Sequence, residues 1–181
     1  MSQLKPAVNS KDHVQGKNEA PLELVEYGDY QCPHCGHAYP IIKNVQRSLG
    51  ADLKFVFRNF PLSESHPDAF NAAVSAEAAG LQQKFWDMHD IIFENQQKLD
   101  MISLFFYAKT IGLDLERFKN DIQKSTLIVK VEQDFESGVR SGVNGTPSFF
   151  INGKKYNGDW EEDAFNQYLK SQLSERSRMN R

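Results

Sequence analysis

The two cysteines of this chain lie in one four-residue unit, between a predicted strand and a predicted helix. Cys32-Pro33-His34-Cys35 follows the alternating segment 22–27, and apolar residues at helical spacing follow the unit as far as Gly50. The sequence has no further cysteine, so the pair can close only one small ring, and so small a ring stabilises a fold little. The spacing therefore indicates redox chemistry rather than a structural cross-link.

The composition is that of an ordinary domain with a sizeable core. Of the 181 residues, 40% are hydrophobic and 25% are charged, so disulfides are not needed for folding. The net charge is −3 with acid and base interspersed, which is not the basic footprint of a nucleic-acid-binding protein. No apolar run reaches the roughly 18 residues of a membrane helix, so we expect no membrane insertion.

The predicted elements run strand, helix, strand, a helical block, two strands and a last helix. The second strand covers 52–60, and about 75 residues with helical periodicity follow it. Strands return at 148–152 and 154–156, around a strong hairpin turn signal at Asn152-Gly153. The pattern is that of an α/β fold interrupted by an all-helical insertion.

We expect this order to divide the chain into a flexible arm, two domains and a polar tail. The arm is 1–20, one domain is built from 21–61 and 142–173, the inserted helical domain is 62–141, and the tail is 174–181. The first twenty residues lack the apolar segment of a secretory signal, so we predict a cytoplasmic location. Separately, we predict a monomer. The alternative is a periplasmic or extracytoplasmic protein whose signal peptide has been removed.

Cys32 is the predicted nucleophile of the pair. It precedes the helix, so unpaired backbone N–H groups and the positive end of the helix dipole favour its thiolate. Pro33 suits the first helical position, and His34 adds a cation or a hydrogen-bond donor nearby. We therefore expect the pKa of the Cys32 thiol to fall below its free value of about 8.5. Cys35, one turn further along, is the predicted resolving thiol.

Two other uses of these residues are disfavoured. A zinc site needs about four ligands, and Cys32, His34, Cys35 and His37 lie too close along one helix start to surround a metal. Covalent haem attachment needs a histidine directly after the second cysteine, where this chain has Gly36. We predict no metal and no organic cofactor.

Several motifs in order give the sequence a resemblance to the DsbA-like thioredoxin-fold family, over about residues 12–173. These motifs are Asp12-His13-x-x-Gly16, LVEYGDYQCPHC, HPDAF, FWDMHDIIF and GVNGTPSFFINGK. The resemblance implies a thioredoxin fold with a helical domain inserted at about 62–141. It also implies that Pro147 is a cis-proline facing the disulfide, and that the Thr146 backbone pairs with an extended substrate.

Glu26 is a further candidate residue. The resemblance places a buried acid six residues before the first cysteine, where it relays a proton to or from Cys35. Alternation places Leu22, Leu24 and Glu26 on one strand face, which favours burial of the carboxylate. The opposite interpretation is a carboxylate that faces solvent.

The predicted function is thiol–disulfide exchange on cysteine-containing proteins, peptides or small thiols, with electrons passing to or from a redox partner. The direction of exchange stays open at this point. One alternative is a peptide-binding, chaperone-like module in which the thiols are incidental. Another is a glutathione-dependent transferase or isomerase on a related fold, although such chemistry has no use for Cys35.

Overall fold

The computed structural model describes residues 2–179 and divides into two compact units. The first, here called the sheet unit, comprises the residues up to Tyr27, His37–Arg58, and those from Ser137 onward. The second, here called the helical unit, comprises Gly28–Gly36 and Asn59–Glu136. The cysteine pair therefore belongs to the helical unit, although the helix that it starts continues into the sheet unit. The domain boundaries expected from the sequence stay a prediction.

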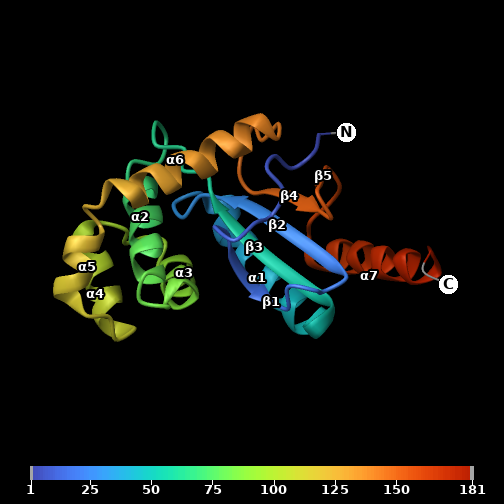
Figure 1. Cartoon of the computed structure of the whole chain (residues 1–181), viewed down its shortest axis with the longest axis horizontal. Helices are drawn as coiled ribbons and strands as arrows, with labels where there is room; N and C mark the ends of the chain where they lie inside the picture. The colour runs from blue at the N-terminus through green and yellow to red at the C-terminus, as the bar shows by residue number, and fades with distance from the viewer. Residues whose placement is uncertain (1, 180–181) are drawn as a thin grey trace. The chain divides into compact units, whose positions relative to one another are not determined.

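Five strands form a single sheet in the order β1-β3-β2-β4-β5 (Figure 1). The strands are β1 (His13–Gly16), β2 (Leu22–Gly28), β3 (Leu53–Asn59), β4 (Ser148–Ile151) and β5 (Lys154–Tyr156). β1 runs antiparallel to β3, and β4 runs antiparallel to both β2 and β5. This order, with a helical insertion between β3 and β4, confirms the predicted thioredoxin fold.

The central strands are buried on both faces, which explains their nearly continuous apolar sequences. In β2, every residue except Glu23 is buried, and β3 has the same pattern with Lys54 as its half-exposed member. Helix α1 (Pro33–Leu49) contributes the apolar side chains of Ala38, Ile42 and Val45 to this core. The short 3₁₀ helix Gly50–Asp52 joins α1 to β3.

The last helix, α7 (Glu162–Met179), packs on the strands at the β4–β5 end of the sheet. Its Phe165 is fully buried, with its ring centroid 5.1 Å from that of Phe149 and 5.3 Å from that of Tyr156. Aromatic pairs at this separation contribute about 0.5–1.5 kcal/mol beyond the area they bury. The hairpin turn predicted at Asn152-Gly153 is present, and both residues have positive φ.

A buried ion pair attaches the N-terminal segment to the sheet. Asp12 Oδ1 lies 2.8 Å from Arg58 Nε and Asp12 Oδ2 lies 2.9 Å from Arg58 Nη2, with the two side chains 4% and 2% exposed. Burial lowers the pKa of Arg58, but the hydrogen bonds that Arg58 donates to Asp12 and to the neighbouring Tyr27 outweigh this effect and raise that pKa above its ordinary value. The guanidinium is therefore held charged inside the sheet unit.

This segment differs from the flexible arm expected for residues 1–20. It contains β1, and Leu4 is buried at 7% exposure. Gly16 has a φ of +99°, and a Cβ there would collide with the carbonyl oxygen of Leu53. The Asp12-x-x-x-Gly16 spacing thus has a physical meaning, because one residue supplies the ion pair and the other allows close backbone approach. The strand is too short for its periodicity to reveal it.

The helical unit contains α2 (Ala69–Gly80), α3 (Phe85–Glu94), α4 (Met101–Thr110), α5 (Leu115–Asp121) and the larger part of α6 (Ser125–Arg140). α2 is its central helix and contacts α3, α4 and α5. Nine of its twelve residues are buried, and the alanines among them allow the neighbouring helices to approach closely. Asp100 and Asp114 cap α4 and α5, each accepting from the backbone N–H three residues on.

A buried polar cluster holds the end of β3 against α2 and α6. Asn59 donates to Glu77 Oε1 at 2.8 Å and to Asp134 Oδ2 at 3.1 Å, and Lys130 Nζ lies 2.7 Å from both Asp134 oxygens. Burial raises the pKa of Asp134, Lys130 lowers it, and the nearby Glu77 raises it further, with a net rise. One lysine thus compensates part of the charge of two buried carboxylates.

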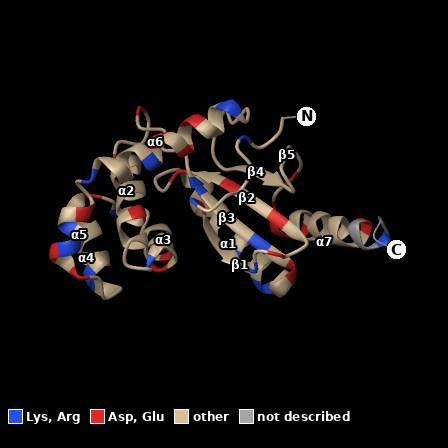
Figure 2. Ribbon diagram, viewed as in Figure 1, with Lys and Arg blue, Asp and Glu red and all other residues tan. Residues whose placement is uncertain are grey.

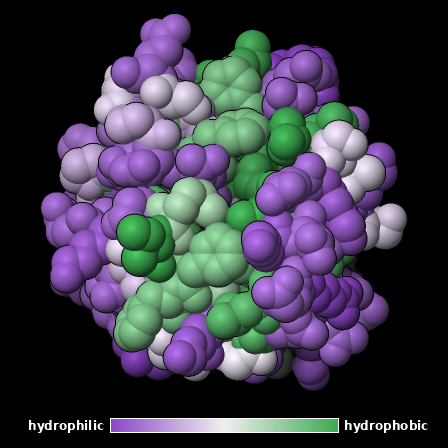
Figure 3. Space-filling model, turned by 90° about the vertical axis from the view of Figure 1, so that its left-hand side faces the viewer, coloured by the Kyte–Doolittle hydropathy of each residue, from purple (hydrophilic) through white to green (hydrophobic). Residues whose placement is uncertain are grey.

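The surface carries charges of both signs. Figure 2 shows Lys and Arg beside Asp and Glu along α4 and α5, and Asp121 pairs with Lys124 at 2.5 Å. Apolar side chains also reach the surface on the side where α4 lies (Figure 3), where Ile102 is 85% and Phe106 64% exposed. Within residues 2–179, none of the helices is long and apolar enough to cross a membrane.

We predict that Asp12→Ala lowers the free energy of unfolding by about 3–5 kcal/mol, because it leaves the Arg58 charge buried without its carboxylate. The matched control is Glu23→Ala, whose partner is Lys54 at 2.6 Å but whose side chain is 21% exposed. That control should cost about 1 kcal/mol or less. Urea denaturation measures both, and equal losses in the two variants would contradict the prediction.

Candidate active site

The structure places Cys32 immediately before the first residue of α1, as predicted. Both cysteines are present as thiols rather than as a disulfide, and they are buried, with Cys32 4% and Cys35 0% exposed. The Gly36 N–H donates to the Cys32 carbonyl at 3.1 Å, so the first turn of α1 closes on the nucleophile. The backbone N–H groups of this first turn and the positive dipole end of the helix therefore lie next to Cys32 and favour its thiolate.

Asp29 organises the turn that carries the cysteines. Its side chain is buried, and Oδ1 accepts hydrogen bonds from the backbone N–H of Gln31 at 2.7 Å and of Cys32 at 3.1 Å. The Cys32 N–H also lies 3.2 Å from the Asp29 carbonyl. This is the side-chain-to-backbone turn that aspartate favours, and it fixes the approach of the chain to α1.

The second carboxylate oxygen of Asp29 binds a distant segment of the helical unit. Oδ2 accepts from the Leu62 N–H at 2.8 Å and lies 2.8 Å from His66 Nδ1. His66 is 19% exposed, whereas the Asp29 side chain is fully buried. One carboxylate therefore joins the cysteine turn to the loop between β3 and α2.

Two glutamines add further bonds between these segments. Gln31 accepts from the Asp68 N–H at 2.7 Å and donates to Asp68 Oδ2 at 3.3 Å. Gln96 donates to the Cys32 carbonyl at 2.6 Å. Gly36 makes this last contact possible, because a Cβ there would collide with the Gln96 side-chain amide. The cysteine turn is thus held from three parts of the helical unit.

Cys35 receives a hydrogen bond of its own. The Asp29 N–H points at its sulfur, with a nitrogen–sulfur distance of 3.4 Å. A sulfur that accepts an N–H bond is stabilised most when it carries negative charge. Asp29 thus touches both members of the pair, Cys32 through its side chain and Cys35 through its backbone.

His34 and Pro33 lie on the open side of the turn. Both are exposed, unlike the two cysteines that flank them. A different histidine lies within the core behind the turn, where His89 Nδ1 is 3.1 Å from the Tyr30 hydroxyl and its ring packs against Phe93. His89 is therefore a packed core residue, and His34 is the histidine inside the motif.

The other predicted site residues belong to the sheet unit. Glu26 on β2 is 3% exposed, so the carboxylate is buried, and its register partner is Phe149 on β4. The Thr146–Pro147 peptide bond is cis, which confirms that part of the resemblance. Their roles in proton transfer and substrate pairing stay predictions.

Sequence reasoning missed Asp29, Gln31, His66 and Gln96. Asp29 carried a usable signal. An aspartate that precedes a helix start by a few residues typically accepts hydrogen bonds from the backbone N–H groups two and three residues further along, which here belong to Gln31 and Cys32. His66, Gln31 and Gln96 carried none, since their partners lie 37 to 64 residues away in the chain.

The structure resembles solved thiol–disulfide proteins over nearly its whole length. Oxidised BdbD from Bacillus subtilis is 26% identical, with a TM-score of 0.83 over 96% of this chain and 97% of that one. The thiol–disulfide exchange protein α-DsbA2 from Wolbachia pipientis has a TM-score of 0.80 at 21% identity, over 90% of this chain and 88% of that one. The second likeness concerns the fold alone.

Similar sequences occur within longer proteins. The Na⁺/H⁺ antiporter NhaA 1 of Mycolicibacterium vanbaalenii is 41% identical over 160 residues, which are 87% of this chain and 26% of that protein. The antiporter of the same name from Salinispora arenicola is 38% identical over 92% of this chain and 25% of its own length. The chain thus spans about a quarter of the curated relatives that it matches.

The predicted cytoplasmic location is wrong. The structures that this chain resembles are DsbA-type exchange proteins, one of them in its oxidised form. Proteins of the DsbA type operate in the bacterial periplasm, where disulfides persist, whereas the cytosol keeps thiols reduced. The prediction failed because it relied on the start of the sequence, which says nothing about the redox poise in which the cysteine pair works.

We predict that Asp29→Ala lowers the free energy of unfolding by about 2–4 kcal/mol, because the N–H groups of Gln31, Cys32 and Leu62 lose a buried acceptor. These three amides should also lose protection in hydrogen exchange. The control is Asp87→Ala on α3, whose pair with Lys84 is about half exposed on both sides, and it should cost about 0.5 kcal/mol or less. Unchanged protection at Cys32 and Leu62 would contradict the role given to Asp29.

A family model described as thioredoxin matches residues 8–171, which is most of the chain. The match includes the Asp12 motif, the cysteine turn, the helical insertion and the Thr146-Pro147 segment. Together with the fold and the cysteine spacing, it shows that the chain belongs to this thioredoxin family, with a DsbA-like fold.

Proposed function

We propose that this chain exchanges dithiols and disulfides with cysteine-containing proteins or peptides, through Cys32 and Cys35. The observation that carries the proposal is the position of Cys32, directly before α1 in a turn fixed by Asp29. A thiol at a helix N-terminus is stabilised as the thiolate, which is the form that attacks disulfides. The chain itself holds both thiols that the cycle needs, so no cofactor is required.

The exchange runs through a mixed disulfide. In the reducing direction, the Cys32 thiolate attacks a substrate disulfide, forms a bond to one sulfur and expels the other as a thiolate. Cys35 then attacks Cys32, the substrate leaves with two thiols, and the chain keeps the Cys32–Cys35 disulfide. The oxidising direction is the reverse, and a separate redox partner returns the chain to its starting state.

We propose that the oxidising direction is the physiological one. Three observations support this choice. They are the Pro33-His34 dipeptide, the likeness to DsbA-type proteins, and the periplasmic rather than cytoplasmic location that this likeness favours. An oxidant stabilises its reduced form, and a helix start with an adjacent histidine acts in that sense by favouring the thiolate. Strong oxidants of this fold have potentials near −120 mV, and reductants lie near −270 mV.

Three residues of the sheet unit have proposed supporting roles. Glu26 is the candidate proton relay, and its burial supports this because a carboxylate that relays a proton works best away from bulk water. Thr146 and Pro147 are the candidate residues for pairing with an extended substrate. The resemblance supports those two, because the Gly-Thr-Pro segment before β4 is part of the matched motif.

We predict that Cys32→Ser abolishes turnover in an assay that follows oxidation of a dithiol peptide. Cys35→Ser, mixed instead with a disulfide that joins two peptides, should accumulate a mixed disulfide on Cys32. The Cys32 thiolate attacks that disulfide and expels one peptide as a thiolate, and no second thiol of the chain resolves the adduct. Mass spectrometry of the quenched reaction measures that adduct. If the Cys32→Ser variant instead retained turnover and formed the adduct on Cys35, Cys32 would not be the nucleophile.

We predict that His34→Leu makes the reduction potential of the pair more negative by roughly 30 mV, which corresponds to about 1.4 kcal/mol in a two-electron couple. The reason is that the reduced form loses a group that favours the Cys32 thiolate. Equilibration with glutathione buffers measures the potential. The control His37→Leu changes a histidine that lies in the sheet unit and pairs with Glu161 at 3.1 Å, and it should leave the potential nearly unchanged. A wild-type potential near −270 mV would contradict the oxidising direction.

A further inference from the structure

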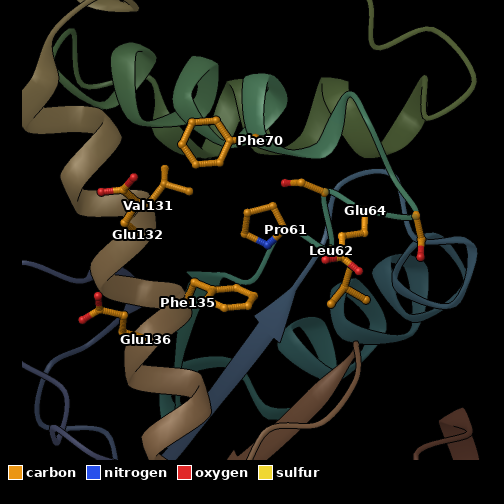
Figure 4. Close-up of a pocket in the computed structure, with 10 residues that line it drawn as sticks. Pro61, Leu62, Glu64, Phe70, Val131, Glu132, Phe135 and Glu136 are labelled. Atoms are coloured by element: carbon orange, nitrogen blue, oxygen red, sulfur yellow. The ribbon is translucent and has the colours of Figure 1, made fainter.

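An open groove of about 900 Å³ lies in the helical unit, between α6, the start of α2 and the loop after β3. In Figure 4 the rings of Phe70 and Phe135 and the side chain of Val131 face the same space as Pro61 and Leu62. Sites of about 300–1,000 Å³ hold drug-sized ligands, so this groove has room for several side chains. Its floor is apolar and suits apolar groups.

The floor of the groove is closely packed. Val131 and Pro61 are buried, and the ring of Phe135 stacks on the buried Phe60 with 4.3 Å between centroids. A preformed apolar surface binds a ligand with a smaller loss of conformational entropy than a surface that must first order itself. The groove is therefore suited to docking rather than being a gap that side chains close.

The rim of the groove is acidic. Glu64, Glu132 and Glu136 are exposed lining residues, and none of the ten lining residues is a lysine or arginine. Lys130 lies one residue before Val131 on α6, but its Nζ is 2.7 Å from both oxygens of the buried Asp134. Its charge is directed into the polar cluster. An apolar floor with a carboxylate rim is complementary to apolar side chains accompanied by cations.

The groove is bonded to the cysteine turn within the same unit. Leu62, which lines it, donates its N–H to Asp29 Oδ2 at 2.8 Å, and Oδ1 of the same carboxylate binds the Cys32 N–H at 3.1 Å. One buried side chain therefore spans from the wall of the groove to the nucleophile. The wall of the groove is thus linked to the exchange site of its own unit through Asp29.

We propose that this groove docks a segment of the substrate protein in which apolar side chains are flanked by lysine or arginine. The inference rests on the proposed exchange function and names the chemistry of the substrate it selects. Apolar side chains bury against the partly exposed rings of Phe70 and Phe135, and the flanking cations face Glu64 and Glu132. Docking holds the substrate while the Cys32 mixed disulfide forms and resolves.

The test uses the full chain and two labelled twelve-residue peptides without cysteine. One contains Leu and Phe flanked by Lys, and in the other each Lys is replaced by Glu. Fluorescence anisotropy should give a dissociation constant at least tenfold lower for the lysine peptide, and raising the salt concentration should weaken its binding. Amide shifts of the wild-type chain should change at Ser63, Val131 and Glu132, a measurement that requires no variant to fold.

A matched pair of variants tests the rim. Glu132→Lys should weaken binding of the lysine peptide about fivefold to tenfold, because it reverses a charge on the rim. Glu116→Lys makes the same change at an exposed position on α5 outside the groove and should leave binding unchanged. Equal binding of the two peptides, equal effects of the two variants, or shift changes confined to other residues would each overturn the proposal. The proposal would also be overturned if the free chain sediments as a dimer and the groove forms the dimer interface.

Because the peptides lack thiols, their binding is independent of Cys32. Exchange activity without selective peptide binding would overturn the docking proposal and leave the exchange function intact. Selective binding without exchange activity would overturn the exchange function on which the docking proposal rests.

Discussion

The Asp29 carboxylate is the interaction on which the geometry of the cysteine turn depends. A buried charge is costly unless hydrogen bonds compensate for it, and each oxygen of Asp29 has two partners. Two of these are backbone N–H groups of the cysteine turn itself, and the other two come from Leu62 and His66. The same carboxylate therefore defines the local turn and fixes that turn to a segment more than thirty residues away in the chain.

This arrangement also suits the chemistry of the thiols. A carboxylate close to a reactive cysteine opposes the thiolate by like-charge repulsion, unless its charge is directed elsewhere. Here the oxygens of Asp29 face N–H donors and His66, while its backbone N–H points at the sulfur of Cys35. The residue thus gives rigidity through its side chain and a favourable dipole to sulfur through its backbone. The helix start supplies the corresponding dipole for Cys32.

The sequence was sufficient to predict the elements with a strong period or a strong boundary signal. The strands of the central sheet, the alanine-rich α2 and the position of Cys32 before α1 all follow from patterns within about ten residues, and the structure has them. β1 was missed because its four residues, three half-exposed and one exposed, carry no usable period, and its attachment depends on Arg58, 46 residues after Asp12. The bonds of Gln31, His66 and Gln96 were out of reach for the same reason.

Tertiary contacts, and not only the cysteine motif, hold the site in place, and the division of the chain into two units reflects this. Gly28–Gly36 follows a strand and starts a helix, so by local order it belongs with the sheet. Its hydrogen bonds nevertheless go to Leu62, His66, Asp68 and Gln96, so it belongs to the helical unit. The helical insertion is therefore part of the support of the thiol pair rather than an addition beside it. Substitutions in the loop between β3 and α2 can consequently alter the exchange chemistry through Asp29, while the four residues of the motif and the sheet stay unchanged.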